Sequence, residues 1–176
     1  MMTATVLVSL MLTGVPKEVG LKVGDTMTAF DPYHVSGPTA GTYTCPVCEY
    51  INLPMVQMWV SGGTPEDIAP VARLLDKAVG KYAAKELHTF VIRTVTPQNR
   101  DDVAQSLQAF AQLQNLNRVA LTVLPTTDHG VSDHKFTGKS IIYVYVRRKI
   151  TAKFVDFVPT QANLSRLSQE IAKICR

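Results

Sequence analysis

Residues 55–79 read MVQMWVSGGTPEDIAPVARLLDKAV, and this stretch decides the fold class. Residues 55–60 are apolar, which is typical of a buried strand. Ser61-Gly62-Gly63 then turns the chain, and Thr64-Pro65-Glu66-Asp67 provides a helix N-cap, a proline at the first helical position and early acids. Apolar residues recur at helical spacing over residues 68–79. The pattern therefore predicts a strand, a tight turn and an amphipathic helix.

The alternation continues toward the C-terminus. Residues 87–95 (LHTFVIRTV) and 119–124 (VALTVL) resemble strands, and a helix between them is expected to begin near Asn99. The buried stripe of this helix comprises Val103, Leu107, Phe110 and Leu113. Strands that alternate with helices predict βαβ units and a mainly parallel sheet.

The last third of the chain has a different order. Residues 140–146 (SIIYVYV) and 150–157 (ITAKFVDF) flank Arg147-Arg148-Lys149, so we expect an antiparallel hairpin with a solvated tip. A final helix follows, with Leu164, Leu167, Ile171 and Ile174 on one face. From residue 55 the predicted order is β-α-β-α-β and then β-β-α, which is an α/β fold around a central mixed sheet.

The N-terminal side is loop-rich. Residues 17–54 contain many Gly, Pro and Asp residues, and short strands are expected only at residues 26–30 and 41–44. Residues 4–12 (ATVLVSLML) have the length of a secretory signal's apolar region, and they are too short to span a bilayer. We interpret residues 1–16 as an export-signal remnant or an N-terminal strand, and residues 17–176 as a single domain outside the cytoplasm.

Composition narrows the function classes. Of the 176 residues 46% are hydrophobic and 18% charged, which is typical of a globular protein. The net charge of +4 is scattered along the chain, which argues against a nucleic-acid partner. The sequence has no GxSxG, P-loop, GxGxxG or HExxH motif, so hydrolase, nucleotide-binding and zinc-protease functions have no support.

The order of elements, with Gly24-Asp25 ahead of Phe30, resembles the redoxin branch of the thioredoxin fold, which includes peroxiredoxin-like and TlpA-like domains. The stretch FDPYHVSGPTAGTYTCPVC (residues 30–48) is similar to a group of bacterial thioredoxin-like proteins with a CPVC motif. The resemblance covers about residues 20–176. It implies a redox pair, Cys45 and Cys48, in which the first cysteine attacks and the second resolves.

Two features depart from thioredoxins. Thioredoxins carry their CxxC directly after the first central strand, at the N-terminus of the next helix, where Ser61-Gly62-Gly63-Thr64 stands here. The position of their cis-proline, ahead of the hairpin, is taken by Thr137-Gly138-Lys139-Ser140. If residues 41–44 were the central strand instead, the cysteines would return to the usual place.

Cys45 and Cys48 have the spacing of a small disulfide ring and allow three interpretations. The first is reversible thiol–disulfide exchange with a protein partner. The second is a binding or scaffold module in which a static disulfide pins the loop. The third is a copper or zinc carrier in which His34, His129 or His134 joins the cysteines. No cofactor is expected under the first two.

Other side chains receive simpler assignments. His34, His129 and His134 are each expected to be a solvated loop residue rather than a ligand. Trp59 is expected to fill the core, and the near-terminal Cys175 to have no special role. Tyr33, Tyr43 and Tyr50 lie near the cysteines in sequence and would either shape a docking surface or pack the loop.

Overall fold

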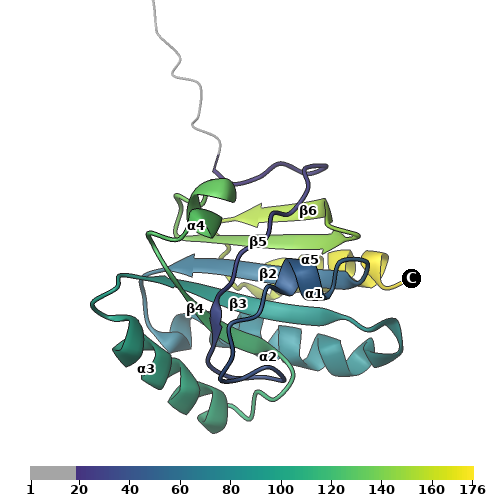
Figure 1. Ribbon diagram of the computed structural model, residues 1–176. Coiled ribbons are helices and arrows are strands. Elements are labelled where there is room, and N and C mark those ends of the chain that lie inside the picture. The colour runs from purple at the N-terminus through teal and green to yellow at the C-terminus, as the bar shows by residue number, and fades with distance from the viewer. Residues whose placement is uncertain (1–18) are drawn as a thin grey trace, which may run out of the picture.

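A computed structural model describes residues 19–176 (Figure 1). Six strands form one mixed sheet in the order β1-β4-β3-β2-β5-β6. Strands β2, β3 and β4 are parallel to one another, and all other neighbours are antiparallel. The strands are β1 (Tyr33–His34), β2 (Pro54–Ser61), β3 (His88–Val95), β4 (Ala120–Pro125), β5 (Ser140–Val146) and β6 (Lys149–Val155).

The helices confirm the predicted order and add short elements. The long helices are α2 (Pro65–Lys81), α3 (Arg100–Leu113) and α5 (Gln161–Ile174). The short ones are α1 (Pro46–Glu49), α4 (His129–Asp133) and the 3-10 turn η1 (Ala83–Lys85). The sequence did not indicate these three, because elements this short carry no full hydrophobic period. No helix within residues 19–176 is long and apolar enough to cross a membrane.

The two faces of the sheet are covered differently. Helices α2, α3 and α5 pack on one face over an aliphatic core (Figure 1). The loop-rich N-terminal segment, α1 and α4 cover the other face over an aromatic core. Trp59 is fully buried in this second core, as predicted. The side chains alternate between the two cores along each central strand, because successive residues of a strand point to opposite faces.

One prediction about the loops is wrong, and the prediction of a solvated hairpin tip holds for Arg147 and Lys149 but not for Arg148. Residues 26–30 form no strand: Thr26 makes one isolated bridge to Lys149. The hairpin tip is not merely solvated, because Arg148 is half-buried and donates from its guanidinium to the carbonyl oxygen of Met27 at 3.0 Å. The N-terminal segment is thus fastened to the hairpin by the residues that were expected to face water.

The alternative with residues 41–44 as the central strand is also wrong. The central strand is β2, which lies between β3 and β5. Residues 41–44 instead flank the edge strand β1, with one bridge between Tyr33 and Tyr43. The proposed export signal at residues 1–16 lies outside the described residues.

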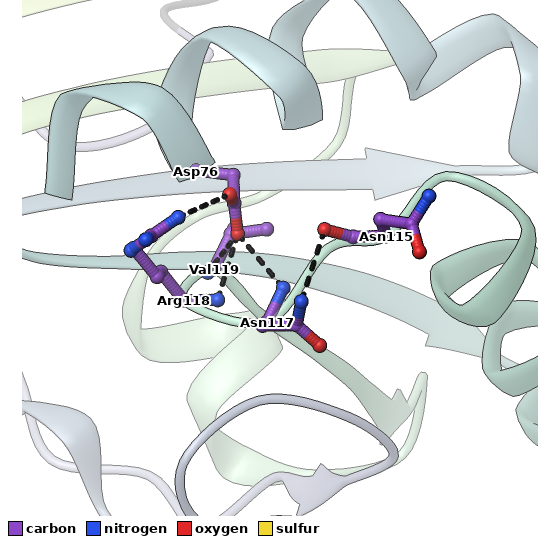
Figure 2. Close-up of polar contacts among 5 residues, drawn as sticks. All are labelled: Asp76, Asn115, Asn117, Arg118 and Val119. Carbon is purple, nitrogen blue, oxygen red and sulfur yellow. Dashed lines mark hydrogen bonds and ion pairs between the residues drawn. The ribbon is translucent and has the colours of Figure 1, made fainter. Parts of the chain in front are cut away.

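A buried carboxylate joins α2 to the entrance of β4 (Figure 2). Asp76 Oδ1 accepts hydrogen bonds from the backbone N–H groups of Asn117, Arg118 and Val119 at 3.0, 2.7 and 3.1 Å. The other carboxylate oxygen lies 3.4 Å from the Arg118 guanidinium. Because one oxygen receives three N–H groups that would otherwise lack partners, Asp76 fixes the loop that leads into the sheet.

Candidate redox site

Cys45 and Cys48 form a disulfide in the described structure. Their sulfurs are 2.15 Å apart and their Cα atoms 5.3 Å apart. Cys45 is the N-cap of α1, and the pair encloses its first turn. The remaining cysteine, Cys175, is buried at the end of α5, where burial raises the pKa of its thiol. Within residues 19–176 only the cysteines of the pair are not buried.

The two cysteines have unequal surroundings. Cys45 is half-buried and packs against the aromatic core, whereas Cys48 is exposed. The backbone N–H of Cys48 donates to the sulfur of Cys45 at 3.1 Å. A hydrogen bond of this kind favours the thiolate over the thiol. The Cys45 sulfur thus accepts a stabilising hydrogen bond, and Cys48 is the more exposed residue of the pair.

His34 holds the loop that leads into the pair. It is 1% exposed, and its Nε2 lies 3.0 Å from the carbonyl oxygen of Thr44. Because a carbonyl only accepts, Nε2 carries the proton, and Nδ1 accepts from the Thr39 hydroxyl at 2.5 Å. Burial lowers the pKa of His34, so the neutral ring that this arrangement requires is favoured. The prediction of a solvated His34 is wrong; the residue positions Thr44 beside Cys45.

Tyr50 places α1 at the end of the sheet where the parallel strands begin. Its ring stacks on His88, the first residue of β3, with centroids 3.7 Å apart. Burial raises the pKa of Tyr50 and lowers that of His88. The stack lies beside Met55, which pairs with His88 at the start of β2. The disulfide therefore lies at the amino end of the parallel strands.

The usual thioredoxin position lies at the other end of β2 and holds no cysteine. Ser61, Gly62, Gly63 and Thr64 are exposed there. Asp67 accepts from the backbone N–H and the hydroxyl of Thr64 at 2.7 and 3.2 Å, which caps α2. This end is built as a helix start, with its polar groups already paired.

Arg93 completes that end, a role that the sequence pattern did not indicate. Arg93 is 6% exposed and donates from its guanidinium to the Gly63 carbonyl oxygen. Burial lowers its pKa, and the nearby Asp67 opposes that shift. A single arginine within the apolar run LHTFVIRTV was the available signal, because a buried arginine needs a partner.

His134 lies beneath α4 in the aromatic core and not in solvent, so that prediction is wrong. It is 0% exposed, its ring centroid is 4.5 Å from that of Trp59, and Nδ1 lies 2.7 Å from the Gly130 carbonyl oxygen. Burial lowers its pKa to about 4. Trp59 lies four residues beyond Met55 along β2, about 13 Å at the usual rise of a strand. His134 is thus distant from the amino-end site.

The metal interpretation finds no ligand set in the described part of the chain. Across residues 19–176 no group of three or more His, Cys, Asp or Glu side chains is placed to hold a metal ion. Both ring nitrogens of His34 are engaged, and His129 is exposed beside Asp128. The structure therefore gives the copper or zinc carrier no support.

Comparison with known proteins places the fold. No family model and no curated sequence matches the chain. A candidate thiol:disulfide interchange protein DsbE from Chlorobium tepidum matches with a TM-score of 0.65 and 14% identity, over 89% of this chain and 99% of that one. The thioredoxin domain of a thiol-disulfide oxidoreductase from Bacteroides vulgatus gives 0.63 and 11%, over 85% and 97%. Peroxidoxin BcpB from Mycobacterium tuberculosis gives 0.60 and 16%, over 89% and 99%.

These matches and the sheet order define the class: the chain has a thioredoxin-like fold of the redoxin type. The predicted α/β architecture with a loop-rich N-terminal segment that carries the CxxC is confirmed. In this chain the cysteine pair lies at the amino end of β2, and the carboxyl end of that strand holds no cysteine.

Proposed function

We propose that the protein exchanges thiols and disulfides with a partner protein through Cys45 and Cys48. The observation that carries this proposal is the asymmetry of the pair, with an exposed Cys48 and a Cys45 sulfur that accepts a backbone N–H at 3.1 Å. An exchange site needs an accessible sulfur to be attacked and a stabilised sulfur to leave. The fold shared with thiol-disulfide oxidoreductases supports the same function.

The reaction proceeds in two balanced steps. A partner thiolate attacks the Cys48 sulfur, a mixed disulfide forms, and the Cys45–Cys48 bond breaks with Cys45 leaving as a thiolate. A second partner thiolate then attacks the partner's own sulfur in the mixed disulfide and releases Cys48 as a thiolate. The partner loses two electrons to form its disulfide, and the pair gains them. The reverse sequence reduces a partner disulfide.

This assignment reverses the order expected from thioredoxins, in which the first cysteine of the motif is the attacking one. The reason is local: Cys48, the third residue of α1, is exposed, whereas the N-cap Cys45 is half-buried. Cys48 is therefore the sulfur that meets the partner, and Cys45 is the one that resolves.

We further propose that residues 17–176 work as one domain outside the cytoplasm. A disulfide persists in oxidising compartments, and the solved structures with this fold include a secreted disulfide oxidoreductase from Mycobacterium tuberculosis. The expected partner is a protein that carries a thiol or a disulfide, and no nucleic-acid partner is expected.

The deciding experiment is the redox midpoint of the pair, from glutathione equilibration, alkylation and intact mass. A midpoint between about −270 and −120 mV supports exchange, because known exchange proteins lie in that range. A value below about −300 mV contradicts it and assigns the pair to a structural disulfide in a binding module. Cys175→Ala serves as the control and should leave the midpoint unchanged.

A further inference from the structure

The edge of the sheet beside the disulfide has hydrogen-bonding groups that point outward. β1 is the outermost strand in the sheet order, and residues 41–44 flank it on the side away from β4. Tyr33 and Tyr43 lie opposite each other, and the neighbouring bond runs from the His34 N–H to the Thr42 carbonyl oxygen at 2.9 Å. In such a pair the backbone N–H and C=O of Tyr43 point away from β1. No partner for either group is found within residues 19–176.

A cleft borders the same edge. It has a volume of about 370 Å³ and is lined by Tyr33, Val35, Tyr43, Arg100, Asp101, Ala104, Gln105 and Gln108. The Tyr43 residue is 61% exposed, and its ring centroid lies 5.2 Å from that of Tyr33. An exposed tyrosine on a half-buried one, beside an unpaired strand edge, is typical of a peptide-docking surface.

Arg100 gives this cleft its charge preference. Its guanidinium carbon lies 5.3 Å from the Tyr33 ring centroid and 5.6 Å from that of Tyr43, and it donates to the Tyr43 hydroxyl. No carboxylate in the described part of the chain lies within ion-pair distance of it. The ring stacking fixes the guanidinium in place, and its remaining N–H groups fit a carboxylate in bidentate geometry. Asp101 also lines the cleft, so its charge disfavours the binding of a second acidic side chain next to the one that Arg100 holds.

The periodicity of a strand connects the cleft to the disulfide. Tyr33 packs on the α3 side of the sheet, whereas His34 and the cysteine loop lie on the α1 side. A peptide strand added to Tyr43 would alternate in the same way. When one peptide residue enters the cleft, the peptide residues directly before and after it therefore face the α1 side. Cys45 lies on that side and follows Tyr43 by only two residues, which is at most about 7 Å along the chain.

We propose that the edge formed by residues 41–44 binds an extended segment of the partner protein by antiparallel strand addition, with an acidic side chain in the Tyr33–Tyr43–Arg100 cleft and the reacting cysteine directly next to it in sequence. This inference rests on the proposed exchange function, and it names the partner segment. It also supplies a docking surface in a chain that lacks the thioredoxin proline at residues 137–140.

The test uses the Cys45→Ser protein and two peptides whose cysteine is activated with 5-thio-2-nitrobenzoate. The Cys48 thiolate attacks the peptide sulfur, a mixed disulfide forms, and the coloured thiolate leaves. The first peptide is Thr-Val-Thr-Asp-Cys-Thr-Val-Thr; the second, Thr-Val-Asp-Thr-Cys-Thr-Val-Thr, moves the acid to the same face as the cysteine. We expect the first peptide to react about tenfold faster than the second. Each rate is first divided by the rate at which the same protein reacts with the free bis(nitrobenzoate) disulfide reagent.

Two variants and one backbone change, each set beside a control, define the surface. Arg100→Ala and Tyr43→Ala should each remove most of the tenfold preference, whereas Arg166→Ala should retain it, although Arg166 also stacks on an aromatic ring, Phe154, at 5.8 Å. Methylation of the peptide's Asp nitrogen should abolish the preference, because that N–H pairs with Tyr43. Methylation of its Cys nitrogen, which points away from the edge, should not. Equal rates for the two peptides, or a preference that survives Arg100→Ala, would overturn the proposal.

A binding measurement separates this proposal from the exchange function. A fluorescent peptide with serine in place of cysteine should bind the wild-type disulfide form and lose about tenfold in affinity with Arg100→Ala. If binding is seen and the redox midpoint is that of a structural disulfide, the exchange function fails and the docking surface stands. If the midpoint supports exchange and neither binding nor the peptide preference is seen, the docking surface fails alone.

Discussion

At its amino end strand β2 lies beside an accessible disulfide, whereas at its carboxyl end it runs into a helix cap without a cysteine. The amino end combines an exposed Cys48 with a loop held by His34. The carboxyl end pairs its polar groups through Asp67 and Arg93. The comparison teaches that a chain can keep the architecture of this fold while its cysteine pair lies at the amino end of the strand.

The largest expected effect tests that division directly. Cys48→Ser should abolish exchange with a peptide thiol, because no disulfide can form and the exposed sulfur is lost. Ser61→Ala, at the carboxyl end, should leave the exchange rate within about twofold; its hydroxyl donates only to the Gly138 carbonyl oxygen at 2.8 Å. Stopped-flow kinetics on both variants decides the matter. A loss of exchange in Ser61→Ala would show that the carboxyl end takes part in the chemistry.

The second effect concerns pH. His134 is buried neutral with a pKa of about 4 and recovers its ordinary pKa of about 6.5 on unfolding, so the unfolded chain binds more protons between these values. The free energy of unfolding should therefore fall as pH drops from 6.5 to 4, by about 3 kcal/mol from this residue. Burial lowers the pKa values of His34 and His88 too, so both act in the same direction.

Urea unfolding of wild type and His134→Leu at pH 7 and pH 4.5 measures this contribution. The variant should show a smaller loss of stability on acidification, and His129→Gln, at an exposed site, should behave as wild type. The same acid-induced loss in His134→Leu and wild type would refute the assignment. His134 lies near the carboxyl end of β2, whereas His34 and His88 lie near its amino end. The acid-induced loss of stability assigned to His134 therefore concerns the carboxyl end alone.

A third effect is confined to the carboxyl end. Asp67→Ala removes the acceptor for the Thr64 N–H and should lower the free energy of unfolding by about 1 kcal/mol, the usual contribution of a helix cap. The redox midpoint should not change. Glu66→Ala, also in the first turn of α2, is the matched control. A shift of the midpoint in Asp67→Ala would mean that the two ends of β2 are coupled.

The smallest effect is expected at the amino end. Tyr50→Leu replaces the ring stacked on His88 and should cost about 1 kcal/mol or less of stability, the usual value of an aromatic pair. Because α1 then loses a contact with β3, the disulfide should also be reduced faster by glutathione. Tyr82→Leu, on the α2 side of the sheet, is the control. A reduction rate unchanged in Tyr50→Leu would show that the stack does not restrain α1.

Much of the fold was predictable because it follows hydrophobic periodicity. Residues 55–79 predicted β2 and α2 closely, and residues 140–146 coincide with β5. The loop predictions failed for a physical reason: Met27 finds partners for its backbone N–H and carbonyl oxygen in the carbonyl and the side chain of the distant Arg148, which no local pattern records.

The site was predictable in its residues and not in its geometry. The CxxC spacing identified Cys45 and Cys48, but their exposures depend on how α1 lies against β3. The buried histidines were mistaken for solvated ones because sequence alone does not show that His34 and His134 find carbonyl partners. Asp76 carried a usable signal, since it falls on the apolar stripe of α2 four residues after Ala72.

The Asp76 carboxylate also turns three backbone amides into probes of cooperative unfolding. The amide hydrogens of Asn117, Arg118 and Val119 are held by a side chain of α2 and not by a neighbouring strand (Figure 2). Releasing them for exchange with solvent deuterium leaves the buried Oδ1 of Asp76 without its three backbone donors, which is costly unless α2 also leaves. These three amides should therefore exchange at the rate set by the joint opening of α2 and β4, and they mark that unit in any deuterium-exchange experiment.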